Sequence, residues 1–257
     1  MVNVGFVSGK GKKENVDTKC VGIRNMKGKN CNWIMMLLVS LLVGCTGKMQ
    51  DCVFSVSDDK QVVFAPGNLA EDGRGFVSHQ WEYGGLFGWG TGDRLADTSD
   101  NWQDYTHFVE WGDNVAGGWR TLTGDEWHYL LFERVDADVK RAVGTVNGMK
   151  GLFLLPDEWV LPLECSFVSQ AKGWNVNVYS VSQWEQMENA GAVFLPAAGF
   201  RWGEVSYSDG CQGLYWSSTA RENGCPYTMH FDGSILSVDW DNTPHFGQSV
   251  RLVRVCN

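Results

Sequence analysis

The feature that most constrains the fold is a regular succession of short apolar segments near the C-terminal end of the chain. They follow one another at roughly ten-residue spacing and are separated by turn-forming residues. The four segments are 213–219, 227–231, 235–238 and 248–255. This spacing predicts a meander of β-hairpins.

The second segment also predicts which side chains face the solvent, because successive side chains of a strand point to opposite faces of the sheet. One set is apolar and is expected to face the core, and the other is polar and is expected to face outward. The two sets are Tyr227, Met229 and Phe231 inside, and Thr228, His230 and Asp232 outside.

Two short helices are expected earlier in the chain. Thr123 and Glu126 have the spacing of a capping box, in which each side chain satisfies a backbone N–H at the start of a helix. Trp127, Leu130 and Leu131 then form one apolar stripe. The same spacing at 182–185 predicts a second helix with Trp184 and Met187 on its buried face, and Gly191 suits the left-handed residue that ends it.

The remaining chain favours strands and loops in a single domain. Strands are expected at 53–56, 62–64, 151–156 and 192–196, and the Gly- and Trp-rich stretch 81–118 is expected to form long packed loops. The chain has 13 Trp, 31 Gly and only six Pro, which argues against disorder. We therefore expect an α+β domain over residues 53–257.

The first 44 residues are expected to be a leader that is removed from the mature protein. Lys27 and Lys29 precede an eleven-residue apolar run that ends at Val43, too short to span a bilayer at about 1.5 Å per residue. The run closes with Leu-Val-Gly-Cys, which resembles the lipobox of bacterial lipoproteins and implies that Cys45 is acylated and becomes the mature N-terminus. Residues 45–52 would then be a lipidated tether, and translation would start at Met1 or Met26.

Charge excludes an ordinary nucleic-acid-binding protein. The whole chain has 21 basic and 30 acidic side chains, and residues 1–45 hold seven of the basic and two of the acidic ones. The mature part therefore has a net charge of about −14, which cannot neutralise phosphates. Such an acidic domain favours neutral glycans or protein surfaces as partners.

Export to an oxidising compartment changes the interpretation of the cysteines. Residues 46–257 contain Cys52, Cys165, Cys211, Cys225 and Cys256, and no two have C-x-x-C spacing. The five His are scattered, so a structural zinc site is not expected. Two pairings are predicted as disulfides: Cys52 with Cys256, which flank the domain, and Cys211 with Cys225, which flank one short segment.

Six motifs are spread over the predicted domain: QVVFAPGNL (61–69), LFGWG (86–90), WRTLT (119–123) with Glu126-Trp127, GAVFLPAAG (191–199), YWSST (215–219) and SVRLV (249–253). Together they resemble a large paralogous family of exported bacterial proteins. Relatives of that family include the Fibrobacter-type major paralogous domain and the variable proteins of diversity-generating retroelements. The resemblance implies a C-type-lectin-like fold of the formylglycine-generating-enzyme variant, with neighbouring termini.

The resemblance does not settle the activity, because this fold hosts enzymes, lectins and protein binders. An enzyme of the formylglycine-generating type needs two Cys a few residues apart near the C-terminus. Here Cys211 and Cys225 are 14 residues apart, and the 215–219 strand has no Cys. We therefore expect no catalysis and no cofactor.

A calcium-dependent lectin is a second alternative. Trp240-Asp241-Asn242 resembles the Trp-Asn-Asp tripeptide of that family with its last two residues exchanged. Calcium takes six to eight oxygen ligands, and the companion Glu-Pro-Asn or Gln-Pro-Asp tripeptide is missing. A loop after a strand explains these residues equally, so no metal site is expected.

The favoured hypothesis is a metal-free recognition surface late in the chain, where the retroelement-diversified relatives contact their ligands. Exposed aromatic side chains between polar ones are typical of such surfaces. Trp202 and Tyr207 are weaker candidates for the same surface. The candidate ligand-binding residues are Arg221, Glu222, Asn223, Thr228, His230, Asp232, Trp240, Asp241, Asn242, His245 and Phe246.

Together these features predict a lipid-anchored, non-enzymatic binding or display module of a Gram-negative cell envelope, at the outer membrane or cell surface. The expected ligand is a glycan or a protein, with no nucleic acid. The alternative is a structural envelope lipoprotein that assembles with other chains.

Overall fold

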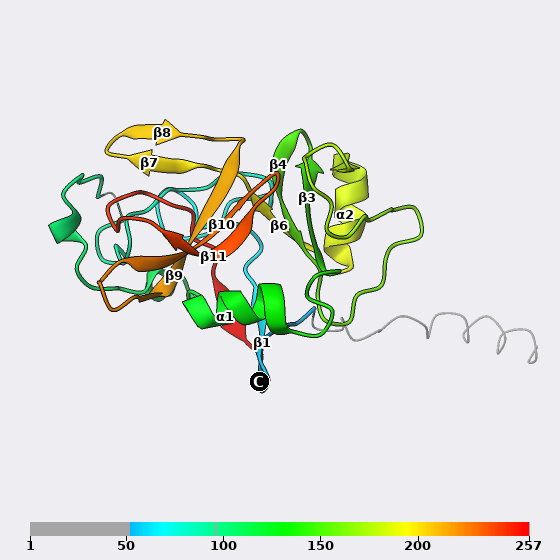
Figure 1. Ribbon diagram of the computed structural model, residues 1–257, viewed down its shortest axis with the longest axis horizontal. Helices are drawn as coiled ribbons and strands as arrows, with labels where there is room; N and C mark the ends of the chain where they lie inside the picture. The colour runs from blue at the N-terminus through cyan, green and yellow to red at the C-terminus, as the bar shows by residue number, and fades with distance from the viewer. Residues whose placement is uncertain (1–51, 96, 257) are drawn as a thin grey trace, which may run out of the picture. The chain divides into compact units, whose positions relative to one another are not determined.

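The computed structural model of the chain describes residues 52–95 and 97–256, which belong to one compact unit, Lys48–Asn257. The predicted leader, Cys45 and most of the tether lie outside the described residues. In the described part, no helix has the length and apolar character needed to cross a membrane. Short strands dominate and the helices are few (Figure 1), which confirms the α+β class.

Within residues 52–95 and 97–256 the strands form four small sheets. One joins the two ends of the domain in the order β1-β2-β12, and another has the order β11-β10-β9. The other two are a four-stranded sheet, β5-β3-β4-β6, and the hairpin β7-β8. The strands are β1 (Phe54–Ser57), β2 (Lys60–Phe64), β3 (Arg141–Val146), β4 (Met149–Leu154), β5 (Asn177–Tyr179), β6 (Val193–Pro196), β7 (Phe200–Trp202), β8 (Val205–Tyr207), β9 (Gln212–Ala220), β10 (Pro226–Asp232), β11 (Leu236–Asp241) and β12 (Val253–Val255).

The predicted meander is confirmed for β9, β10 and β11, which pair antiparallel in sequence order. The last predicted strand is shorter than expected, because only 253–255 pair as a strand, with β2. Residues 248 and 249 make isolated bridges instead, to Phe87 and Tyr215. The segment therefore runs along β9 before it reaches β2.

The first predicted helix begins as expected. In α1 (Gly124–His128) the Thr123 hydroxyl accepts the Glu126 N–H while the Glu126 carboxylate accepts the Thr123 N–H. The chain continues into a π-helical turn, η3 (Tyr129–Glu133), and the apolar stripe of Trp127, Leu130 and Leu131 is buried.

The second helix begins two residues earlier than predicted. Ser180 and Gln183, rather than Ser182 and Glu185, form the capping box of α2 (Val181–Asn189). The predicted buried face with Trp184 and Met187 is confirmed. Gly191, at φ +97°, takes the left-handed conformation expected of it.

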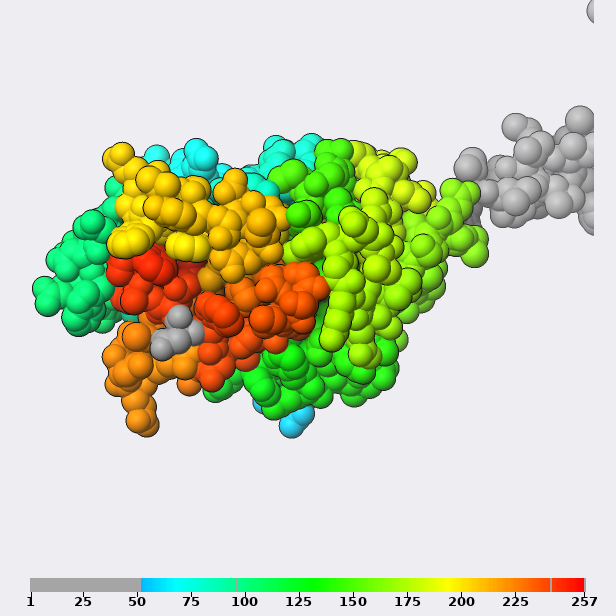
Figure 2. Space-filling model, turned by 45° about the horizontal axis from the view of Figure 1, so that its top comes forward, coloured from blue at the N-terminus to red at the C-terminus, as the bar shows by residue number. Residues whose placement is uncertain are grey.

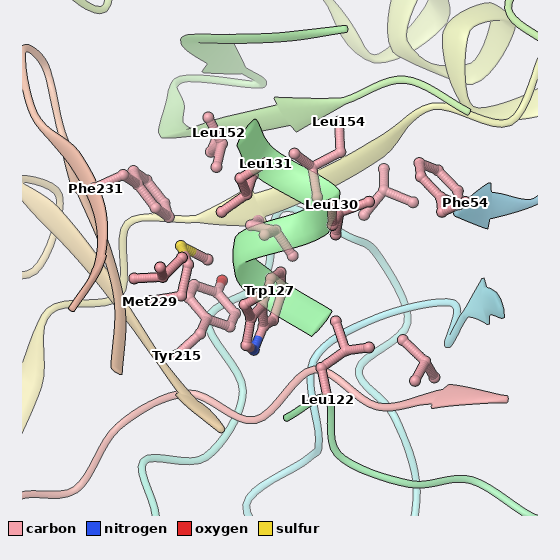
Figure 3. Close-up of a cluster of buried hydrophobic side chains, with 14 of the residues drawn as sticks. Phe54, Leu122, Trp127, Leu130, Leu131, Leu152, Leu154, Tyr215, Met229 and Phe231 are labelled. Atoms are coloured by element: carbon pink, nitrogen blue, oxygen red, sulfur yellow. The ribbon is translucent and has the colours of Figure 1, made fainter. Parts of the chain in front are cut away.

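Three hydrophobic clusters form the core of the part of the chain that the structure describes. The first surrounds Trp127, Leu130 and Leu131, which pack against side chains of β1, β4, β9 and β10 (Figure 3). The second lies between α2 and the four-stranded sheet, and the third packs Trp89, Trp111 and Trp216 together. Most of the stretch 81–118 is loop, as predicted, with two 3₁₀ turns, η1 (Trp102–Asp104) and η2 (Trp111–Asn114).

The predicted disulfide between Cys211 and Cys225 is wrong, because both thiols are free in the structure. In the β9–β10 hairpin Gln212 pairs with Asp232 and Ala220 with Pro226. Cys211 and Cys225 therefore lie at opposite ends of the hairpin, roughly 25 Å apart at about 3.3 Å per residue. A disulfide tolerates a Cα separation of at most about 7 Å.

The other predicted pairing, between Cys52 and Cys256, stays a prediction. Cys52 precedes β1 and Cys256 follows β12, and these two strands pair with opposite edges of β2.

Candidate functional site

The predicted recognition segment folds into the turns and strands of the β9–β10–β11 sheet and the loop that follows it. Figure 2 shows this region, in orange and red, against the yellow β7–β8 hairpin. Residues 221–223 lie in the β9–β10 turn, Thr228, His230 and Asp232 lie on β10, and Trp240 and Asp241 end β11. Asn242, His245 and Phe246 lie on the loop 242–247.

The outward assignment of Thr228 and His230 is wrong. Their exposed fractions are 0% and 2%. β10 is the central strand of its sheet, and both of its faces are covered. The Trp240 ring stacks on the His230 imidazole at a centroid distance of 4.1 Å and an angle of 20°. The two β10 side chains therefore lie beneath the surface and Trp240 lies on it, 39% exposed.

The buried polar groups beneath Trp240 are only partly satisfied. His230 Nε2 lies 3.0 Å from Gln212 Oε1, whereas His230 Nδ1 and Thr228 Oγ1 have no hydrogen-bond partner among the described residues. Burial lowers the pKa of His230, opposed by the negative charge of Asp232. The imidazole is therefore neutral at pH 7.

Three other predicted residues stabilise turns. Arg221 forms an ion pair of 2.7 Å with Asp239 and lies over the ring of Tyr227. Asn223 Oδ1 accepts the Cys225 N–H at 3.0 Å. Asp232 Oδ1 accepts hydrogen bonds from the backbone N–H groups of residues 234 and 235. Burial alone would raise the pKa of Asp232, but these hydrogen bonds outweigh burial and lower it.

The structure brings Phe246 together with the two weaker candidates, Trp202 and Tyr207, through Phe200. The ring centroids of Tyr207 and Phe200 are 5.5 Å apart, those of Phe200 and Phe246 are 5.3 Å apart, and those of Trp202 and Phe246 are 5.9 Å apart. We call these four side chains the aromatic ladder. Trp202 is 51% exposed and Tyr207 is 42% exposed, so the ladder presents ring surface to the solvent.

The β7–β8 hairpin positions the ladder. Phe200 pairs with Tyr207 and Trp202 with Val205, and residues paired across a sheet share a face. Phe200, Trp202, Val205 and Tyr207 therefore lie on one face of the hairpin. Arg201 lies on the other face.

Arg201 fixes the hairpin to the loop that carries Phe246. Its backbone exchanges two hydrogen bonds of 2.8 Å with Gly247, and its guanidinium donates to the carbonyl oxygens of Leu86, Asp97 and Gly203. A Cβ on Gly247 would lie 2.8 Å from Arg201 Nε and 2.9 Å from the Leu86 carbonyl oxygen. Glycine permits this close approach, which keeps Phe246 against Phe200.

The hairpin was missed from the sequence, although it carries a recognisable signal. Apolar or aromatic residues occupy every second position at Phe200, Trp202, Val205 and Tyr207, around a tight turn at Gly203. Gly203 has φ +57°, a conformation typical of two-residue hairpin turns.

The side chains that gather at this surface are mainly aromatic. No group of three or more His, Cys, Asp or Glu that could hold a metal ion occurs in the described part of the chain. The side chain of Asp241 lies outside the described atoms. Near the ladder, His245 lies edge-on to Phe246 at 4.8 Å, and burial lowers its pKa, opposed by Asp100.

No family model matches this chain, and neither the curated proteins nor the solved structures compared with it include a match.

Proposed function

We propose that this protein is a non-enzymatic binding module that recognises a glycan or a protein through the aromatic ladder and Trp240. The observation that carries the proposal is the continuous stack from Tyr207 through Phe200 to Phe246 and Trp202 on one exposed surface. Aromatic rings bury a large area with few rotatable bonds, so they bind at a small cost in entropy.

The construction of the surface supports recognition rather than incidental exposure. The ladder lies on a hairpin whose base is held by Arg201 and Gly247, so its rings are ordered before a ligand arrives. Preorganisation of this kind improves affinity because little freedom is lost on binding. The polar neighbour His245, which lies edge-on to Phe246, would supply a directional hydrogen bond at the edge of the stack.

The wider setting is part of the same proposal. We propose an exported lipoprotein of the cell envelope, anchored through Cys45, whose domain has the C-type-lectin-like fold of the formylglycine-generating-enzyme variant. Two short capped helices support this fold, as do the long loops and the placement of β1 and β12 on either side of β2.

The test is a binding screen of the purified full-length chain on an array of glycans and envelope proteins, once with calcium and once with EDTA. We expect capture that survives EDTA and falls at least tenfold in a Trp202→Ala/Tyr207→Ala double variant. Because Trp202 is 51% exposed and Tyr207 is 42% exposed, the melting temperature of this variant should change by no more than about 3 °C.

Phe132→Ala is the matched control, because Phe132 is an exposed aromatic residue on η3 that is not part of the ladder. Its capture should equal that of the wild type. Capture that is lost in EDTA would favour a calcium-dependent site at Asp241 and Asn242 instead. Failure to capture any probe would favour the structural envelope role.

A further inference from the structure

A second candidate site lies apart from the aromatic ladder, where two sheets meet. A cavity of about 180 Å³ opens between the start of β3, the loop 170–172 and the β10–β11 turn. Figure 2 shows the orange end of the β10–β11 hairpin against the yellow-green segment that contains the loop 170–172. The proposed recognition function does not use this cavity.

Hydrogen bonds hold the walls of the cavity in place. The Gln170 N–H donates to the Arg141 carbonyl oxygen at 3.0 Å, and the Gly173 N–H donates to the Gly233 carbonyl oxygen at 2.7 Å. The loop is thus tied to β3 on one side and to the β10–β11 turn on the other. Asp232 stabilises that turn through the hydrogen bonds described above. The cavity is therefore preformed.

The floor of the cavity is apolar. It is lined by Ala142, Val143, Leu152 and Leu236, and Val143 and Leu152 also belong to the cluster around Trp127. A hydrocarbon group placed here would be removed from water at a gain of about 25 cal/mol per Å² of buried apolar area.

The rim of the cavity is cationic, which is unusual in so acidic a chain. Arg141 and Lys172 line it, against one carboxylate, Asp232. Arg141 is oriented by a 2.7 Å hydrogen bond from Nε to the Leu131 carbonyl oxygen and by the Phe132 ring, 5.0 Å from its guanidinium carbon. Its two terminal amino groups donate to no other residue in the described ranges. Burial lowers the pKa of Arg141, opposed by the negative charge of Asp138.

These features define the ligand class. The volume equals that of about six water molecules at roughly 30 Å³ each, enough for six to eight non-hydrogen atoms. We propose that the cavity binds a small aliphatic carboxylate, with its carboxylate on Arg141 and Lys172 and its hydrocarbon on Val143, Leu152 and Leu236. A guanidinium with free terminal donors suits a carboxylate because the two groups have matching planar geometry.

The proposal is tested by titrating the full-length chain with isovalerate, which has seven non-hydrogen atoms, in a calorimeter. The neutral alcohol 3-methylbutan-1-ol is the matched probe, and we expect it to bind at least tenfold more weakly. Lys172→Gln should weaken isovalerate binding about fivefold, whereas Lys140→Gln, outside the cavity, should leave it unchanged. Ala171→Leu should abolish binding by filling the cavity.

Melting temperatures within a few degrees of the wild type would show that the variants fold. Equal affinity for the acid and the alcohol, no heat with either probe, or full binding by folded Ala171→Leu would each overturn the proposal. The Trp202→Ala/Tyr207→Ala variant should bind isovalerate normally, so failure of this site and failure of the ladder are distinguishable.

Discussion

At the scale of single residues, Trp240 has two surfaces with different roles. Its outer face is part of the proposed recognition surface, and its inner face covers His230 at 4.1 Å. The low pKa of His230 is caused by burial, and the stacked indole contributes to that burial. The environment of the imidazole therefore reports whether Trp240 stays closed over β10.

Replacing Trp240 with alanine should raise the pKa of His230 toward its ordinary value of about 6.5, because water then reaches the ring. An NMR pH titration of the imidazole measures this shift. Trp202→Ala removes another exposed indole and should leave the titration unchanged. An unaltered His230 pKa in Trp240→Ala would contradict the covering role.

The same shift has a consequence for stability. The pKa of His230 is lower in the folded protein than in the unfolded chain, so the unfolded chain binds a proton first as the pH falls. The contribution of the buried, neutral His230 to the free energy of unfolding is therefore fully present above a pH of about 6.5. It is lost as the pH decreases toward the folded-state pKa. Trp240→Ala should reduce this acid sensitivity.

Arg251 is recognisable from the sequence as part of the SVRLV motif, but its surroundings in the fold are not. Arg251 is 1% exposed, and its guanidinium donates to Asn68 Oδ1 at 3.3 Å and to Gln80 Oε1. These partners lie 183 and 171 residues earlier in the chain. A contact over such a separation is set by the fold, and no local pattern encodes it.

At the scale of elements, α1 depends on one buried carboxylate. Glu126 completes the capping box and also receives two hydrogen bonds from the Arg120 guanidinium, at 2.6 and 2.8 Å, and one from Lys60 at 3.1 Å. Burial alone would raise the pKa of Glu126, but the hydrogen bonds from Arg120 and Thr123 outweigh burial and lower it.

Glu126→Gln should therefore lower the free energy of unfolding at pH 7 by about 3 kcal/mol, because it leaves a partly buried Arg120 without its counter-charge. The lowered pKa means that wild-type Glu126 stabilises the fold above its unfolded-state pKa of about 4.3 and loses this contribution at lower pH. Urea unfolding at pH 7 and at pH 3 should thus show the difference between variant and wild type shrinking in acid.

Asp125→Asn is the control for this experiment. Asp125 is an exposed carboxylate in the same turn. Removing its charge should lower the free energy of unfolding by no more than about 1 kcal/mol, through the lost interaction with the helix dipole. A Glu126→Gln effect as small as that of Asp125→Asn, or one that does not depend on pH, would contradict the role assigned to Glu126.

Local sequence signals explain which elements were predictable. The start of α1 was found because its capping box is contained in four residues. The start of α2 was displaced because Ser180–Gln183 and Ser182–Glu185 both fit that pattern, and the end of β5 at Tyr179 decides between them. The alternation of β10 failed as a guide to exposure because the strand is central and Trp240 covers its polar face.

At the scale of the whole molecule, the C-terminal segment joins two cores. Val250 and Leu252 pack in the cluster of Trp89, Trp111 and Trp216, and Val253 packs in the cluster around Trp127. Adjacent residues serve different cores because their side chains point in opposite directions. The backbone also closes the β1-β2-β12 sheet, where Val253 pairs with Phe64. Loss of packing here should therefore destabilise the domain as a unit.

Val253→Ala tests this coupling, because Val253 is 0% exposed while Val255 on the same strand is 40% exposed. Val253→Ala should lower the free energy of unfolding by about 2 kcal/mol through the lost burial and the cavity left behind, and Val255→Ala should change it by less than about 0.5 kcal/mol. Both variants keep the backbone hydrogen bonds of β12, so the difference between them reports packing alone.

For Val253→Ala, the urea transitions followed by tryptophan fluorescence and by circular dichroism should coincide. The reason is that the C-terminal segment joins both hydrophobic clusters to the β1-β2-β12 sheet, so that all three unfold together. Two separated transitions would mean that the cores unfold independently and that the C-terminal segment does not couple them.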